Sequence, residues 1–130
     1  HIDVCHKLHP PVPGLEFERM DALELAEVLP EESFDFVICI QAASKFGDLP
    51  RFIHGVNHVL RPGGRLLLAE ALARNQLDDT LKAIDKEGLE QDACHDMSRS
   101  VHAVGLCRIP TGMSYMRIVA RKEGEFQQVP

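Results

Sequence analysis

Two histidines have a spacing that could hold a metal ion. His54 and His58 lie four residues apart, the separation that puts zinc ligands on one face of a helix. Zinc protease motifs carry a glutamate directly after the first histidine, and Gly55 takes that place here. Both histidines also lie off the apolar stripe of the helix expected there. We therefore expect a solvated pair and no metal site.

A cysteine and a histidine stand side by side at Cys94 and His95, which could suggest a nucleophile and its base. Neighbouring side chains on a strand point to opposite faces of a sheet, so these two would diverge. No other pair of residues offers a general base or a nucleophile. The sequence therefore predicts no catalytic residue.

Composition limits the class of protein. The chain has 130 residues, the size of one domain, and 45% of them are hydrophobic, as in ordinary globular proteins. A net charge of −6 argues against nucleic acid as a partner. No apolar run is long enough to cross a membrane, so no membrane partner is expected. The four cysteines are widely spaced, which suits reduced thiols in a cytoplasmic protein.

Short apolar runs alternate with helix-like segments, a pattern that favours an α/β sheet covered on both faces. The run FDFVICI at Phe34–Ile40 is expected to be a strand buried on both faces. Apolar runs predict further strands at Ile2–Cys5, Leu15–Met20, Arg65–Ala69, Gly88–Asp96 and Ser114–Arg121. A short helix or turn is expected over Leu23–Leu29 and a helix over Leu77–Glu87, whereas Ser98–Arg108 fits neither pattern.

The clearest helix runs from a cap at Asp48 through Leu60. Pro50 suits its first turn, because the missing amide of proline is not needed there. Apolar side chains recur at helical spacing and predict a buried stripe of Leu49, Ile53, Val56 and Leu60. The turn Arg61-Pro62-Gly63-Gly64 ends this helix.

Two sequence motifs stand in order along the chain. One is the segment Asp21–Val37, with the pattern DA, LP and SFDFV, and the other is VLRPGG at Val59–Gly64. Together, and at this spacing, they resemble the class I S-adenosylmethionine-dependent methyltransferases that act on small molecules. The resemblance implies a Rossmann-like, mostly parallel sheet with an antiparallel last strand. It also implies that residues 1–130 form a single, partial domain that lacks the first strand of that fold.

The resemblance implies cofactor-binding roles for two carboxylates. In the family, the acidic residue of the second strand accepts hydrogen bonds from the ribose hydroxyls of S-adenosylmethionine, and Asp3 takes that position. Asp21 and Ala22 match the pair beside the adenine, where the carboxylate accepts from the exocyclic amine. Each carboxylate has a structural alternative: Asp3 bonds local backbone at a strand end, and Asp21 caps the following helix.

Ile40 and Gln41 close the family's fourth strand, where the sulfonium end of the cofactor and the methyl acceptor meet. Open α/β sheets bind ligands beyond the carboxyl ends of their strands, which points to the same position. Gln41 is therefore a candidate for contact with cofactor or substrate, with an exposed glutamine that serves no ligand as the alternative. The resemblance implies a small-molecule methyl acceptor. The candidates for its pocket are an amino-terminal segment missing from this sequence, Ala42–Asp48 and Ser98–Thr111.

In two places the sequence departs from the family, and these departures leave alternatives to a complete methyltransferase open. The glycine-rich loop expected before Asp3 is absent, and His9-Pro10-Pro11-Val12-Pro13 stands where the family has a helix. Three explanations stay open. The chain is the C-terminal portion of a longer methyltransferase, which its start at His1 in mid-strand favours; it exchanges strands in a homodimer; or it is a non-catalytic scaffold domain. A nicotinamide-dependent oxidoreductase would share the sheet but needs a Tyr-Lys pair that is missing after VLRPGG.

Overall fold

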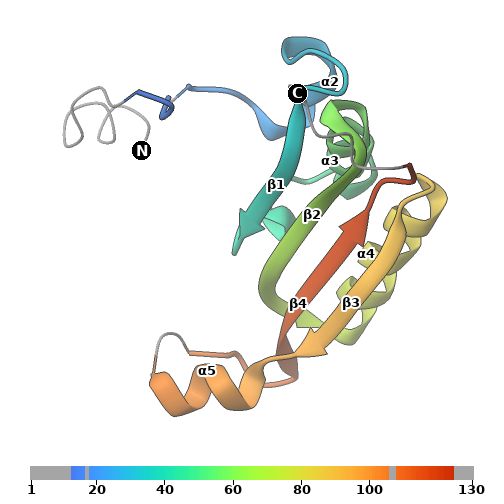
Figure 1. Cartoon of the computed structure of the whole chain (residues 1–130). Helices are drawn as coiled ribbons and strands as arrows, with labels where there is room; N and C mark the ends of the chain where they lie inside the picture. Colours follow the sequence, from blue (N-terminus) through green and yellow to red (C-terminus); the bar gives the residue numbers. More distant parts are fainter. Residues whose placement is uncertain (1–12, 17, 106–107, 125–130) are drawn as a thin grey trace.

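The computed structural model describes residues 13–16, 18–105 and 108–124, and they form a four-stranded sheet with helices packed on it (Figure 1). β1 runs parallel to β2, and β4 runs antiparallel to both β2 and β3. This is the expected Rossmann-like arrangement, in which the last strand opposes the others. The strands lie in the order β1 (Phe34–Ile40), β2 (Leu60–Ala73), β4 (Met113–Arg121) and β3 (Glu90–Asp96).

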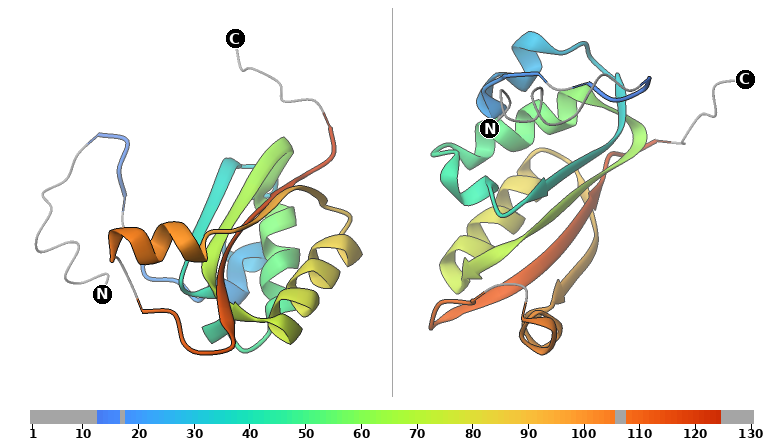
Figure 2. Two further views of the ribbon diagram at one scale, coloured as in Figure 1. Left: turned by 90° about the horizontal axis from the view of Figure 1, so that it is seen from below. Right: turned by 90° about the vertical axis from the view of Figure 1, so that its left-hand side faces the viewer.

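The helices divide between the two sides of the sheet. Figure 2 shows α2, α3 and α4 together on one side and α5 projecting from the other. A 3-10 turn, η1 (Ala22–Glu24), leads into α2 and packs with it on α3. The helices are α2 (Leu25–Val28), α3 (Leu49–Val59), α4 (Arg74–Lys86) and α5 (Ser98–Val104), and a second 3-10 turn, η2 (Ala43–Lys45), precedes α3.

α3 forms as the sequence predicts. The Asp48 carboxylate accepts a hydrogen bond from the Arg51 backbone N–H at 3.2 Å and so caps the first turn. Ile53 and Val56 of the apolar stripe are completely buried, and Leu60 continues that burial into β2. They pack against the helix-facing side of the sheet, where the core consists of Leu66, Leu68 and Leu72 of β2 and Met116, Ile118 and Ala120 of β4.

The expectation that β1 is buried on both faces is wrong. Val37 and Cys39 pack against the core, but Phe36, Ile38 and Ile40 are 60%, 65% and 58% exposed. Alternate side chains of a strand point to opposite faces, and α2, α3 and α4 all cover the same one. The sheet is therefore covered by these helices on one side only, and within the described ranges β1 is an edge strand.

The strand predicted at Leu15–Met20 is also wrong. Leu15 makes one isolated bridge, while residues 16 and 18–20 have no regular structure. Alternating side chains are compatible with a strand, but a strand forms only where a neighbour pairs with its backbone. The strand predicted at Ile2–Cys5, which includes Asp3, lies outside the described residues.

Several element boundaries differ from those the sequence predicts. β2 spans Leu60–Ala73 instead of Arg65–Ala69, because the RPGG segment continues into the sheet rather than ending outside it. α4 begins at Arg74 instead of Leu77, since the Gln76 side chain accepts from the Ala73 backbone N–H at 2.8 Å and caps an earlier turn. None of the helices in the described ranges has the length and apolar character needed to cross a bilayer.

Gly64 has no room for a side chain. A Cβ placed on it would lie 2.8 Å from the carbonyl oxygen of Arg61 and 2.9 Å from that of Asp35. Both obstacles are backbone atoms, so the segment itself would have to move. We expect Gly64→Ala to lower the free energy of unfolding by about 2 kcal/mol, as crowding of a packed interior does.

Urea unfolding of the variant against the parent chain measures this effect. Gly88→Ala is the comparison, because nothing lies within 4 Å of its Cβ position and only its positive φ of 84° is unfavourable. That variant should lose about 1 kcal/mol. Equal stability of Gly64→Ala and the parent would contradict the close approach.

Candidate functional site

Gln41 is held in an unusual backbone conformation where β1 ends. Its φ of 55° lies in the left-handed region, which residues other than glycine rarely adopt. The Gln41 N–H donates to the Ala69 carbonyl of β2 at 2.7 Å, which ties this turn to the sheet. Strain of about 1–3 kcal/mol persists only where the surroundings impose it, and it collects at functional sites. The predicted site residue therefore occupies a fixed, strained position.

Tyr115 lies at the same end of the sheet, although it is not among the site residues predicted from the sequence. The Gln41 side-chain amide donates to the Tyr115 hydroxyl at 3.4 Å, across 74 positions of sequence. Strand pairing explains the approach, because Tyr115 lies opposite Ala71 in the β2–β4 ladder. No motif or spacing in the sequence points to Tyr115 as a site residue. The register of the antiparallel last strand would have been needed to find it.

Ile40 contributes its side chain to the open side of the sheet. It is 58% exposed and shares a face with Ile38. A ligand beyond the end of β1 on that side would therefore meet an aliphatic surface beside Gln41.

Asp21 adopts the structural alternative that its sequence context allows. Its Oδ1 accepts from the Leu23 backbone N–H at 2.9 Å and caps η1. Ala22, the next residue, packs against the core. The Asp21 side chain is nevertheless exposed, and a carboxylate offers about four acceptor positions, so one capping bond leaves room for a ligand donor. The cap fixes where that carboxylate lies.

The structure thus positions four of the five predicted residues, in two pairs. Asp21 and Ala22 are held by η1, and Ile40 and Gln41 are held by β1. Both pairs are connected to α3: η1, which holds Asp21 and Ala22, packs on this helix, and the chain passes from the end of β1 through η2 into the same helix. Asp3 lies outside the described residues.

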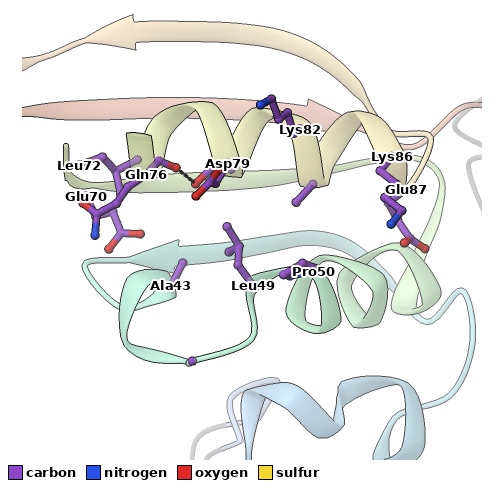
Figure 3. Close-up of a pocket in the computed structure, with 13 residues that line it drawn as sticks. Ala43, Leu49, Pro50, Glu70, Leu72, Gln76, Asp79, Lys82, Lys86 and Glu87 are labelled. Carbon is purple, nitrogen blue, oxygen red and sulfur yellow. Dashed lines mark hydrogen bonds between the residues drawn. The ribbon is translucent and has the colours of Figure 1, made fainter. Parts of the chain in front are cut away.

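A pocket of about 590 Å³ opens between the start of α3 and the length of α4 (Figure 3). It begins where the chain leaves β1, since Ala43 comes two residues after Gln41, and Glu70 follows Ala69 of β2. Glu70 is only 7% exposed. Neither this glutamate nor the pocket is among the sites that the sequence predicts.

Cys39 lies next to the buried carboxylate on the same side of the sheet. Burial raises the pKa of the Cys39 thiol, and the negative charge of Glu70 raises that pKa further. Backbone hydrogen bonds from Ala43 and Ala42 oppose this rise with a smaller effect. The thiol is therefore held in its neutral form, which is a poor nucleophile.

The sequence also raises His54 and the Cys94–His95 pair as candidates for chemistry. His54 Nδ1 lies 2.7 Å from the Glu87 carboxylate, and its side chain is largely exposed. Within the ranges the structure describes, no three metal-binding side chains gather at one point. Cys94 packs toward the core while His95 is exposed, so the predicted divergence of this pair is confirmed.

Comparison with known proteins fits this geometry. The model of a family described as "Methyltransferase domain" matches residues 2–68, just over half of the chain. This chain belongs to that family. All five predicted cofactor-binding residues fall inside the matched span, and so does the strained turn at Gln41.

Two relatives illustrate the likeness in sequence. The phthiotriol/phenolphthiotriol dimycocerosates methyltransferase of Mycobacterium leprae is 44% identical over 78 residues, which cover 60% of this chain and 28% of that protein. The fatty-acid O-methyltransferase of Mycolicibacterium smegmatis is 31% identical over 83 residues, covering 64% and 29%. The chain thus spans less than a third of the length of either relative.

Solved structures show the same fold at low sequence identity. The cyclase SpnF superimposes with a TM-score of 0.72 at 18% identity, covering 93% of this chain and 60% of that one. Geranyl diphosphate C-methyltransferase from Streptomyces coelicolor gives 0.59 at 12% identity, covering 75% and 51%. One of these proteins carries the name of a cyclase, so the fold alone does not decide the reaction.

The strain at Gln41 can be measured directly. Gln41→Gly and Gln41→Ala both remove the side chain, but only glycine adopts a positive φ without penalty. We expect the glycine variant to exceed the alanine variant by about 1 kcal/mol in free energy of unfolding. At Ile40, inside β1, the same comparison should favour alanine. Equal stability of the two Gln41 variants would contradict the strain.

Proposed function

We propose that the protein containing this chain is an S-adenosylmethionine-dependent methyltransferase that acts on a small molecule. The family match over residues 2–68 carries the proposal, because it spans every predicted cofactor-binding residue. The strained Gln41 at the carboxyl end of β1 supports it independently. Relatives named for dimycocerosates and for fatty acids support an acceptor with a long aliphatic part.

The residues on this chain fit part of the cofactor. The Asp21 carboxylate is exposed, fixed by one hydrogen bond and still able to accept from an amine. Ala22 is fixed beside it, and Gln41 projects from the end of the sheet where α/β folds bind ligands. Asp3 would hold the ribose. These residues suit the adenosyl portion and the neighbourhood of the sulfonium.

S-adenosylmethionine, when bound, supplies a methyl group that its sulfonium has already activated. The protein then has mainly to bind, align and exclude water, and alignment alone lowers a barrier by several kcal/mol, roughly 7–11 in good cases. In our proposal Asp21 binds the adenine, and Gln41, oriented by Tyr115, borders the place of transfer. This division of labour needs no nucleophile from the protein.

Binding of S-adenosylhomocysteine to the full-length protein tests the function. Isothermal titration should give saturable heat for the parent protein. Asp21→Asn should bind about tenfold more weakly, the loss expected when a charged acceptor becomes a neutral one. Because asparagine caps helices as well as aspartate does, the free energy of unfolding of this variant should stay within about 0.5 kcal/mol of that of the parent.

Asp48→Asn is the matched control, since Asp48 caps α3 in the same way. This variant should bind S-adenosylhomocysteine as the parent does. Absence of heat with the parent protein would overturn the methyltransferase proposal. Unchanged affinity in Asp21→Asn would overturn the role of Asp21 alone.

A second candidate, an interaction module that pairs with another copy, is favoured by one observation. Phe36, Ile38 and Ile40 form an exposed apolar row on β1, which is an edge strand in the described part of the chain. Edge strands offer unpaired backbone groups to a second chain, and a two-fold axis would bring the same row against itself. A homodimer through β1 would pair these backbone groups and bury the apolar row.

Light scattering over a range of protein concentrations separates the candidates. If β1 pairs with a second copy, Ile38→Lys should shift the molar mass from dimer to monomer. Val104→Lys is the control, because Val104 is 64% exposed, as Ile38 is at 65%, but lies on α5. A monomeric full-length protein that binds S-adenosylhomocysteine would rule out the interaction module.

A further inference from the structure

The pocket between α3 and α4 joins an aliphatic wall to one buried carboxylate. Leu49, Leu72 and Ala83 supply apolar surface, and Glu70 lies at one end, near Ala43 (Figure 3). The other buried polar residue of the lining is Thr80, whose hydroxyl donates to the Gln76 carbonyl at 2.7 Å. Glu70 is thus the buried charge that a ligand in this pocket would meet.

The other charged side chains of the lining lie at the rim on or after α4. Asp79, Lys82 and Lys86 are exposed, so water and salt screen them. Glu87, at the end far from Glu70, is bonded to His54 and Asn57. Exposed charges of mixed sign change affinity by little, roughly 0–1 kcal/mol each. Selectivity for the charge of a ligand would therefore come from Glu70.

The pocket also adjoins the place of methyl transfer in the proposed function. Glu70 follows Ala69, which pairs with Ile40 and accepts from the Gln41 backbone, so Glu70 lies level with the end of β1. Its side chain is on the helix-covered face of the sheet, opposite to that of Ile40. A molecule lying along the aliphatic wall with its polar end at Glu70 would have that end close to where β1 ends. The pocket wall would thus hold the aliphatic tail of the acceptor, and the neighbouring end of β1 would lie beside its reacting group.

We propose that this pocket binds the methyl acceptor as an uncharged aliphatic alcohol and excludes the corresponding carboxylate, an inference that rests on the proposed function. The volume of about 590 Å³ suits a small amphiphile. A hydroxyl donates to the Glu70 carboxylate, whose two oxygens accept several hydrogen bonds beside its contacts within the protein. A carboxylate in the same place would put two negative charges together with little water to screen them.

Isothermal titration of octan-1-ol and of octanoate into the full-length protein tests this selectivity. The two probes share their chain and differ in their head group. The parent protein should bind the alcohol at least about tenfold more tightly than the carboxylate, a modest share of the repulsion between close charges. Glu70→Gln should reduce this ratio to about threefold or less, mainly by tightening the binding of octanoate.

Asp79→Asn is the matched control, because it removes an exposed carboxylate of the same lining. It should leave the alcohol-to-carboxylate ratio unchanged. A second variant, Ala83→Phe, fills the pocket and should weaken both probes, with a thermal melt to verify that it folds. Equal binding of the two probes to the parent, or an unchanged ratio in Glu70→Gln, would overturn the proposal.

S-adenosylhomocysteine is titrated into the same samples. If it fails to bind while the selectivity between the probes persists, the proposed function falls and the alcohol-selective pocket stands. If it binds while the selectivity is absent, the pocket proposal falls and the methyltransferase stands.

Discussion

The hydrogen-bond ladder of β2 positions the part of the proposed site that lies at the end of β1. Ala69 pairs with Ile40 of β1 and accepts from the Gln41 backbone, which sets where the chain leaves the sheet. On its other side β2 pairs with β4, so that Ala71 brings Tyr115 within reach of Gln41. Glu70, between them, faces the helices and the pocket. A slip of one residue would turn each of these side chains to the opposite face.

Burial of the core holds that register. Leu66, Leu68 and Leu72 alternate along β2 and are all nearly inaccessible to water, packed against the stripe of α3. Each such side chain contributes about 1.5–3 kcal/mol when fully buried, and a slipped register would expose all of them together. The strain at Gln41 is small beside this. The sheet can therefore impose a left-handed turn at the end of β1, and with it a fixed geometry for a ligand.

The sequence predictions that the structure confirms rest on signals that lie within a single helix or strand. The cap at Asp48 and the stripe through Ile53 and Val56 lie within one helix; they predicted the start of α3 correctly and its end to within one residue, since Leu60 belongs to β2. Pairing between distant segments decided the rest. Leu15–Met20 has the alternation of a strand, but among its described residues only Leu15 forms a bridge. β1 is covered by helices on one face alone. Tyr115 and Glu70 entered the site only through strand register, which composition and spacing do not specify. For Asp21 the capping interpretation is confirmed, and the cofactor-binding interpretation stays a prediction with which the cap is compatible, because a capping carboxylate keeps acceptor positions for a ligand.

Titration of unlabelled S-adenosylhomocysteine into the ¹⁵N-labelled full-length protein, followed by amide chemical shifts, tests the central claim most directly. We expect the amide signals of Ala22 and Gln41 to move together along one saturation curve, while that of Cys94, in a strand at the far edge of the sheet, stays in place. Saturable binding that leaves both Ala22 and Gln41 unmoved would contradict this claim, because the adenosyl group would then lie away from the end of β1.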